Sequence, residues 1–204
     1  MRPSSAGRTV FLLPSFAGGG AERVVVTVAG TLAERGRDIH LIVLSGTGPL
    51  ADLVSSALPV HVLDRPRVRA ALPALVRTIR RLRPATIVST ISQLNLAVAA
   101  LRPAMPAGMA VYLRETNTPS RNLASLPPLA HLLMRGGYRM LYPKATGVVC
   151  NAGIVAQELE RDFLVEPARI HRIDNPVDIT DLRARARPTR RAPGPGPRFV
   201  AAGR

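Results

Sequence analysis

The residues with the clearest chemical potential are three consecutive glycines, Gly18, Gly19 and Gly20, which separate an apolar run from a helical pattern. The apolar run predicts a strand, and the helical pattern begins beside Glu22 and Arg23. Glycine lets backbone N–H groups approach a ligand with no Cβ in the way, and the dipole of the following helix favours negative charge at its start. These residues therefore predict a site for a phosphate or another anionic ligand. The alternative is a tight turn of small residues that binds nothing.

Two common phosphate-binding loops do not fit this sequence. The dinucleotide fingerprint requires a third glycine where Arg23 stands, and an acidic residue after the second strand, where the chain has Ser45. The phosphate loop of nucleotide hydrolases requires Gly-Lys-Ser or Gly-Lys-Thr, and the only lysine of the chain is Lys144. The glycine run therefore indicates another kind of anion site.

A second polar cluster follows the apolar run 110–113, at the end of a predicted strand. The guanidinium of Arg114 could bind a phosphate or an acidic sugar. Glu115, with a pKa raised by burial, could accept the proton of a substrate hydroxyl. We therefore predict that Arg114 and Glu115 are catalytic and that Asn117, close behind them, binds the substrate. The alternative is that Arg114 and Glu115 form a local ion pair that caps the loop.

Strand and helix patterns alternate along the rest of the chain, which is typical of an α/β fold with a doubly wound, mainly parallel, Rossmann-like sheet. Such a sheet would bring the glycine loop and the Arg114 cluster to one edge. Strands are predicted at 10–13, 39–44, 60–63, 85–90, 110–113, 146–150 and 169–173. Helices are predicted at 22–35, 72–82, 129–141 and 153–162, with a small-residue helix ending at 101 and a short one at 50–56.

Composition narrows the classes of partner. An excess of 28 basic over 13 acidic residues gives a net charge of +15, which attracts phosphates, anionic lipids or nucleic acid. Nucleic acid is disfavoured, because aromatic residues make up only 3% and tryptophan is absent. The four histidines do not stand at metal-ligand spacings, so we predict no metal site. A lone cysteine, Cys150, and the absence of a leader or a membrane-length apolar run favour the cytoplasm.

The predicted helix 129–141 has an apolar side next to a basic stripe, formed by His131, Arg135 and Arg139 at every fourth residue. Such a helix suits the surface of an anionic membrane, here the inner face of the cell membrane. The alternative is a helix that packs on the sheet with its arginines in solvent.

Composition also predicts the domain boundaries. The Rossmann-like domain is expected to span 1–182, followed by a linker at 183–198 that is rich in arginine, proline and glycine. The apolar residues 199–204 read as the first strand of a further domain.

Four segments, in chain order, resemble glycosyltransferase family 4, whose members have the GT-B fold. The glycine loop 18–23 is similar to the first loop of the family, and 148–151 is similar to the end of its last full strand, where a serine often stands in place of Asn151. The segment 173–178 resembles the turn before the interdomain hinge, and 199–204 resembles the opening of the second domain. The resemblance covers nearly the whole chain and implies that Asn151 binds substrate.

The resemblance implies the acceptor-side half of a retaining enzyme that transfers a hexose from a nucleotide-sugar to a saccharide or glycolipid, in polysaccharide or cell-envelope assembly. It implies no metal or other cofactor. The donor-binding residues would belong to the second domain, so this chain alone is expected to be inactive. Many relatives carry a histidine at the end of the fifth strand, where Arg114 and Glu115 stand here, as in a subset that acts in polysaccharide synthesis.

Two other functions stay open at this stage. The chain could be a non-catalytic Rossmann-like module that binds an anionic ligand or a membrane surface. It could also be part of a nucleotide-sugar epimerase, which shares the two-domain fold.

Overall fold

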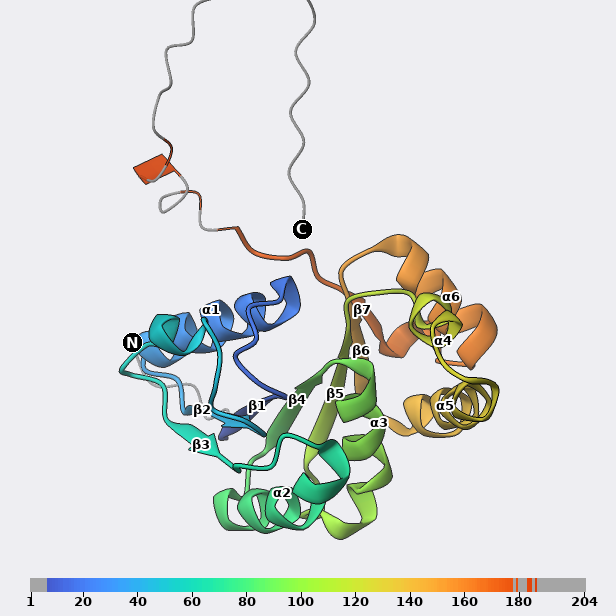
Figure 1. Cartoon of the computed structure of the whole chain (residues 1–204), viewed down its shortest axis with the longest axis horizontal. Coiled ribbons are helices and arrows are strands. Elements are labelled where there is room, and N and C mark those ends of the chain that lie inside the picture. Colours follow the sequence, from blue (N-terminus) through green and yellow to red (C-terminus); the bar gives the residue numbers. More distant parts are fainter. Residues whose placement is uncertain (1–6, 178, 180–182, 185, 187–204) are drawn as a thin grey trace, which may run out of the picture.

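Seven parallel strands form one sheet in the order β3-β2-β1-β4-β5-β6-β7 (Figure 1). The computed structural model describes residues 7–177, 179, 183, 184 and 186. In chain order, β2 and β3 are added on one side of β1, and β4 to β7 are then added on its other side. The strand order therefore reverses between β1 and β4, where α/β sheets leave a crevice at the carboxyl ends of the strands. The strands are β1 (Thr9–Leu13), β2 (Ile39–Val43), β3 (Val60–Val62), β4 (Thr86–Thr90), β5 (Ala110–Glu115), β6 (Gly147–Cys150) and β7 (Ile170–Arg172).

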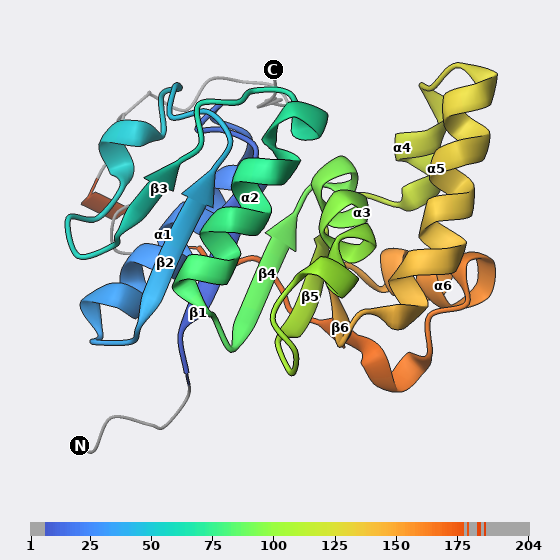
Figure 2. The same ribbon diagram turned by 90° about the horizontal axis from the view of Figure 1, so that it is seen from below.

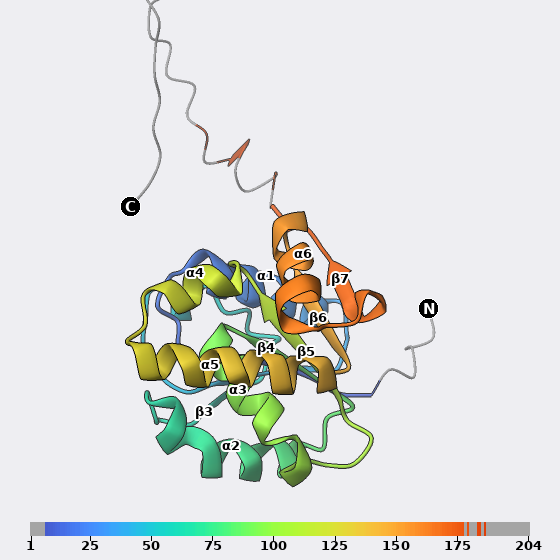
Figure 3. The same ribbon diagram turned by 90° about the vertical axis from the view of Figure 1, so that its right-hand side faces the viewer.

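Helices cover both faces of this sheet. One face carries α1, whereas α2 and α3 lie on the other (Figure 2). The helices α4, α5 and α6 gather beyond β5, with α5 on the outside of the molecule (Figure 3). The α-helices are α1 (Gly20–Glu34), α2 (Val68–Leu82), α3 (Ser92–Ala100), α4 (Pro119–Ala124), α5 (Pro128–Leu141) and α6 (Gly153–Phe163). Short 3-10 helices lie at η1 (Ala51–Leu53), η2 (Arg102–Ala104), η3 (Tyr142–Lys144) and η4 (Pro167–Arg169).

Alternation along β1 divides the core in two. Val10 and Leu12 belong to the larger cluster, under α2, α3, α5 and α6. Phe11 and Leu13 belong to the smaller cluster, under α1. Successive side chains of a strand point to opposite faces, so a strand buried on both faces is apolar throughout. The continuous apolar run of β1 therefore identifies it as a central strand.

The predicted α/β class and doubly wound parallel sheet are confirmed. Two local predictions were less accurate. The sequence analysis missed α4, because its six residues are too few to show a helical period. The helix expected at 50–56 is only the three-residue η1.

Most of the predicted linker, 183–198, and the whole of 199–204 lie outside the described residues. The predicted domain boundaries therefore stay predictions. Among the residues that the structure describes, no helix combines the length and the hydropathy needed to cross a bilayer.

Candidate functional site

A cavity of about 460 Å³ opens where the sheet order reverses, at the carboxyl ends of the strands. The start of α1, the start of α3, the loops after β5, β6 and β7, and α4 all contribute to its wall. Most of the lining side chains are amides and hydroxyls, which both donate and accept hydrogen bonds. The lining residues are Gly20, Ala21, Glu22, Ile91, Ser92, Thr116, Asn117, Asn122, Asn151 and Asn175.

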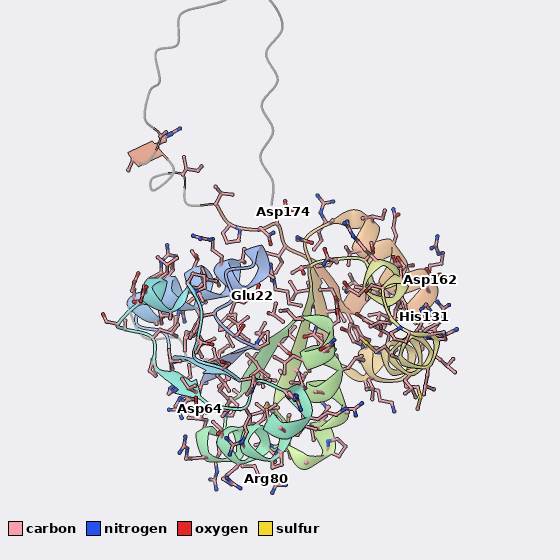
Figure 4. The ribbon with its side chains drawn as sticks, in the orientation of Figure 1. Glu22, Asp64, Arg80, His131, Asp162 and Asp174 are labelled. Carbon is pink, nitrogen blue, oxygen red and sulfur yellow. The ribbon has the colours of Figure 1, made fainter. Side chains whose placement is uncertain are left out.

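The glycine loop reaches this cavity only at its end. Gly20 and Glu22 line the wall, whereas Gly18, Gly19 and Arg23 do not, and Arg23 is exposed. Glu22 is buried, on the part of α1 that lies toward the middle of the molecule (Figure 4). Its carboxylate lies against Gly19, so closely that a Cβ on Gly19 would collide with it. A negative group thus already stands at the start of α1, where it would repel a phosphate.

Arg114 and Glu115 lie on opposite faces of β5, because they are neighbours in a strand. Both are buried, with exposed fractions of 9% for Arg114 and 1% for Glu115. None of the ion pairs in the described chain joins them, so the local pair considered above is not formed. Neither lines the cavity directly. Their predicted catalytic roles stay predictions.

The carboxylate of Glu115 accepts four hydrogen bonds from the layer formed by α3, α5 and η3. Ser92 Oγ and Asn95 Nδ2 each donate at 3.1 Å, and the hydroxyls of Tyr142 and Tyr138 donate as well. Burial nevertheless raises the pKa of Glu115 to about 7. Since burial disfavours the charged form, the hydrogen bonds offset only part of that effect. Glu115 can therefore gain or lose a proton near neutral pH.

Ser92 connects this buried carboxyl to the cavity. It lines the wall and donates to Glu115, and its Oγ also accepts a hydrogen bond from Asn122 Nδ2 at 2.8 Å. Ile91, just before it, has φ +80°, which is unusual for a β-branched residue. This strained turn from β4 into α3 places Ser92 at the wall. Backbone strain of this kind clusters at functional sites.

Arg114 approaches the cavity from the other face of the sheet. Its Nη2 donates to Asn175 Oδ1 at 2.8 Å, and Asn175 lines the wall. Its Nη1 is buried with no hydrogen-bond partner in the part of the chain that the structure describes, and burial lowers the pKa of the guanidinium. In the described chain no carboxylate pairs with Arg114. An anionic group of a ligand would supply the missing counter-charge.

The predicted binding residues Asn117 and Asn151 are both at the wall, and Asn151 Oδ1 is buried without a partner. The sequence analysis did not single out Asn122 or Asn175, nor the network around Glu115. One signal was available: Tyr138 and Tyr142 stand four residues apart, the spacing that puts two side chains on one helix face. Within the described residues, no three side chains of His, Cys, Asp or Glu are grouped to hold a metal.

On α5, two of the three basic residues contact neighbouring elements. His131 Nδ1 is 3.2 Å from the Leu123 carbonyl oxygen, and the guanidinium of Arg135 is 5.9 Å from the ring centroid of Phe163. Arg139 is exposed. The outward face, opposite buried Tyr138, is apolar and consists of Leu129, Leu132, Leu133 and Met140.

The Rossmann-like fold and the cavity at its switch point can now be set beside known proteins. The model of Glycosyltransferase Family 4 matches residues 18–181. The chain belongs to this family and corresponds to its N-terminal domain.

Solved glycosyltransferases share the fold at low sequence identity. Anabaena Alr3699/HepE, in complex with UDP and glucose, gives a TM-score of 0.62 at 16% identity over 85% of this chain and 46% of that one. The lipopolysaccharide outer core galactosyltransferase WaaB gives 0.59 at 10% identity, over 83% and 46%. An alpha-glucosyltransferase in complex with UDP and DNA gives 0.56 at 10%, over 88% and 45%. The chain thus spans less than half the length of these enzymes. No curated protein sequence matches it.

Proposed function

We propose that this domain binds the acceptor of a retaining hexosyltransferase, which moves a sugar from a nucleotide-sugar donor to a saccharide or glycolipid in polysaccharide or cell-envelope assembly. The observation that carries the proposal is the polar cavity, with four asparagines, Ser92 and Thr116 in its wall. Amides and hydroxyls suit a ligand covered in hydroxyl groups. Family membership favours transfer over an epimerase or a binding module.

Glu115 would act through Ser92. An acceptor hydroxyl at the wall would donate its hydrogen bond to Ser92 Oγ, which already donates to Glu115. As the acceptor oxygen bonds to the anomeric carbon and the nucleotide leaves, the acceptor proton would pass to Ser92. The proton of Ser92 would pass to Glu115, whose pKa of about 7 suits a proton acceptor at neutral pH. Arg114 would meet a negative charge of the bound substrates near Asn175.

A binding experiment tests the acceptor site. The chain, labelled with ¹⁵N, is titrated with methyl glycosides of glucose, galactose and mannose. We expect saturable shifts of the side-chain amides of Asn117, Asn122 and Asn151, with none at Gln93, which is exposed outside the cavity. Asn122→Ala should weaken binding, and the matched control Gln93→Ala should not. Shifts of Gln93 as large as those of the cavity amides would contradict the proposal.

Transfer itself should need the donor domain as well, because catalysis requires both reactants to be held together. We expect no transfer when the purified chain is incubated with UDP- and GDP-hexoses and a lipid extract. Clear glycosylation by this chain would contradict the division of roles between two domains.

We further propose a cytoplasmic location at the inner face of the membrane, through α5. Its outward apolar face is open to solvent in the described part of the chain, with Leu132 and Leu133 exposed by 66% and 64%, and the same helix carries the exposed Arg135 and Arg139. Apolar side chains next to arginines fit an anionic bilayer. Replacing both leucines by glutamine should abolish sedimentation with phosphatidylglycerol vesicles. Ile154→Gln, at an equally exposed position on α6, is the control. Unchanged sedimentation of the leucine variant would exclude this face.

A further inference from the structure

A second cavity, of about 500 Å³, lies at the amino ends of the strands, at the edge opposite the candidate acceptor site. Its wall is formed by the end of α3, by the segment 102–109 before β5, and by η3 after α5. Figure 2 shows the separation: the arrowheads of the strands point to one edge, and the lime-coloured segment before β5 lies at the other. One helix, α3, joins the two sites, because Ser92 begins it and Ala100 ends it.

The wall of this cavity combines apolar side chains with two basic ones. Met105, Met109 and Leu141 supply apolar surface, together with alanines and prolines, and Arg102 and Lys144 are the charged members. Among the described residues, no acidic, amide or aromatic side chain lines it. Arg102 and Lys144 are therefore the side-chain hydrogen-bond donors among the described wall residues, and none of these residues offers a ring for stacking a base. Apolar walls with a few placed polar groups are typical of small-molecule sites, and methionine adapts to flexible apolar ligands.

In the described structure, one guanidinium nitrogen of Arg102 lacks a hydrogen-bond acceptor. Arg102 is half-buried, and its Nη1 is buried with no hydrogen-bond partner among the described residues. Neither Arg102 nor Lys144 takes part in an ion pair in the described part of the chain. A buried donor without an acceptor is destabilising, and such a group calls for an explanation. An oxygen of a bound anion would supply both the acceptor and the counter-charge.

The segment that carries Arg102 is held in place without using its charge. Arg80 of α2 donates from Nε to the carbonyl oxygen of Ala104, at 2.9 Å. Arg80 lies across the sheet from Glu22 (Figure 4). This hydrogen bond helps to hold the segment and does not involve the Arg102 guanidinium.

We propose that this cavity binds a lipid anion, with its carboxylate or phosphate at Arg102 and Lys144 and the first part of its acyl chain against Met105 and Met109. Leu141 links the cavity to α5, since it ends that helix. The ligand can come from two sources, a free fatty acid or an anionic phospholipid of a bilayer. Both present the same chemistry to the cavity. The proposal does not depend on glycosyl transfer, because binding alone reveals it.

Calorimetry with dodecanoate, below its micelle concentration, and with dodecanol tests the cavity. We expect dodecanoate to bind and the uncharged dodecanol to bind at least about tenfold more weakly, as the loss of a charge-assisted hydrogen bond implies. Arg102→Met should weaken dodecanoate binding by about tenfold or more. The control Arg77→Met removes an equal charge from an exposed position on α2 and should change binding less than about twofold.

A stability measurement separates a ligand site from a structural role. Because Arg102→Met removes an unpartnered buried donor, its melting temperature should equal or exceed that of the parent chain. Phosphatidylglycerol and phosphatidylcholine vesicles then distinguish the sources. Binding of dodecanoate in solution favours a free fatty acid, and an Arg102-dependent preference for phosphatidylglycerol alone favours a bilayer lipid. The proposal would be overturned if Arg102→Met left the binding of both dodecanoate and phosphatidylglycerol vesicles unchanged. It would also be overturned if dodecanol bound as tightly as dodecanoate.

Discussion

The two edges of the sheet carry opposite kinds of cavity, although helix α3 and strand β5 each extend from one cavity to the other. At the carboxyl edge the wall is polar and rich in amides, and the one charged member among its described residues is Glu22. At the amino edge the wall is apolar, and its charged members are Arg102 and Lys144. The carboxyl edge therefore suits a neutral, hydroxyl-rich ligand, and the amino edge suits an amphipathic anion.

This difference shows that a glycine loop alone does not identify an anion site, because the charges of the side chains around the loop also count. A glycine loop before a helix favours an anion through its backbone alone. Here Glu22 occupies that favourable position itself, so the loop is already neutralised from within the chain. Among the described residues, the guanidinium nitrogens that are buried without a partner belong to Arg102 and Arg114, both outside this loop.

The largest expected effect is a pH dependence of stability that comes from Glu115. Its carboxyl has a pKa near 4.5 when unfolded and about 7 when folded. Between these values the folded state binds more protons, so the contribution of Glu115 to the free energy of unfolding falls as pH rises from about 4.5 to 7. The total change is on the order of 3 kcal/mol. Urea unfolding at several pH values measures it.

The variant Glu115→Gln should remove this dependence, because the amide does not titrate. At the other edge, Arg102→Met should leave the dependence unchanged. If the two variants gave the same pH profile, the buried carboxyl would not be the titrating group.

Alanine substitutions at the three glycines of the first loop should have smaller effects on the free energy of unfolding, and these effects should differ from one glycine to the next. Gly18 has φ +86°, so Gly18→Ala should lower the free energy of unfolding by about 1–2 kcal/mol through strain. Gly19 has φ −65°, and a methyl there would only push aside the end of the Glu22 side chain. A Cβ on Gly20 meets nothing within 4 Å, so Gly20→Ala should not destabilise the chain.

Sugar binding by the same variants then shows which glycine serves the cavity. Gly20→Ala should weaken the binding of methyl glycosides, because Gly20 lines the wall. Gly19→Ala should weaken it through the displaced Glu22. Unaltered binding in both would mean that the loop is only a turn. Unfolding curves and amide shifts are needed together.

The fold could be predicted from sequence because its signals are local. The apolar run of β1, the glycine loop and the start of α1 lie close together in the sequence. The alternation of strand and helix then repeats along the chain. Asn117 and Asn151 could be predicted for the same reason, since Asn151 directly follows β6 and Asn117 stands two residues after the end of β5. The opposite orientation of Arg114 and Glu115 also follows from strand alternation, a step that the sequence analysis did not take.

Other features depend on packing between distant segments. The hydrogen bond from Tyr138 to Glu115 forms only because α5 packs with Tyr138 facing inward. The hydrogen bond from Asn122 to Ser92 forms only because the short α4 lies beside the start of α3. The basic stripe of α5 was visible, but its position depends on Phe163 of another helix. Arg102 gave no sequence signal, because an unpartnered nitrogen is recognised only when its surroundings are known.

The smallest effect, and the most direct comparison of the two edges, is the response of binding to salt. A neutral glycoside meets hydrogen bonds at the carboxyl edge, so its affinity should stay constant between about 0.05 and 0.5 M sodium chloride. Dodecanoate meets Arg102 and Lys144, and the exposed position of Lys144 lets salt screen part of that attraction. Its affinity should fall by about two- to fivefold over the same range. Lys144→Gln should reduce this fall, because it removes the exposed charge and leaves the buried one. Glycoside binding that weakened with salt as much as dodecanoate binding would show that the carboxyl edge recognises charge, and the site there would then centre on Arg114.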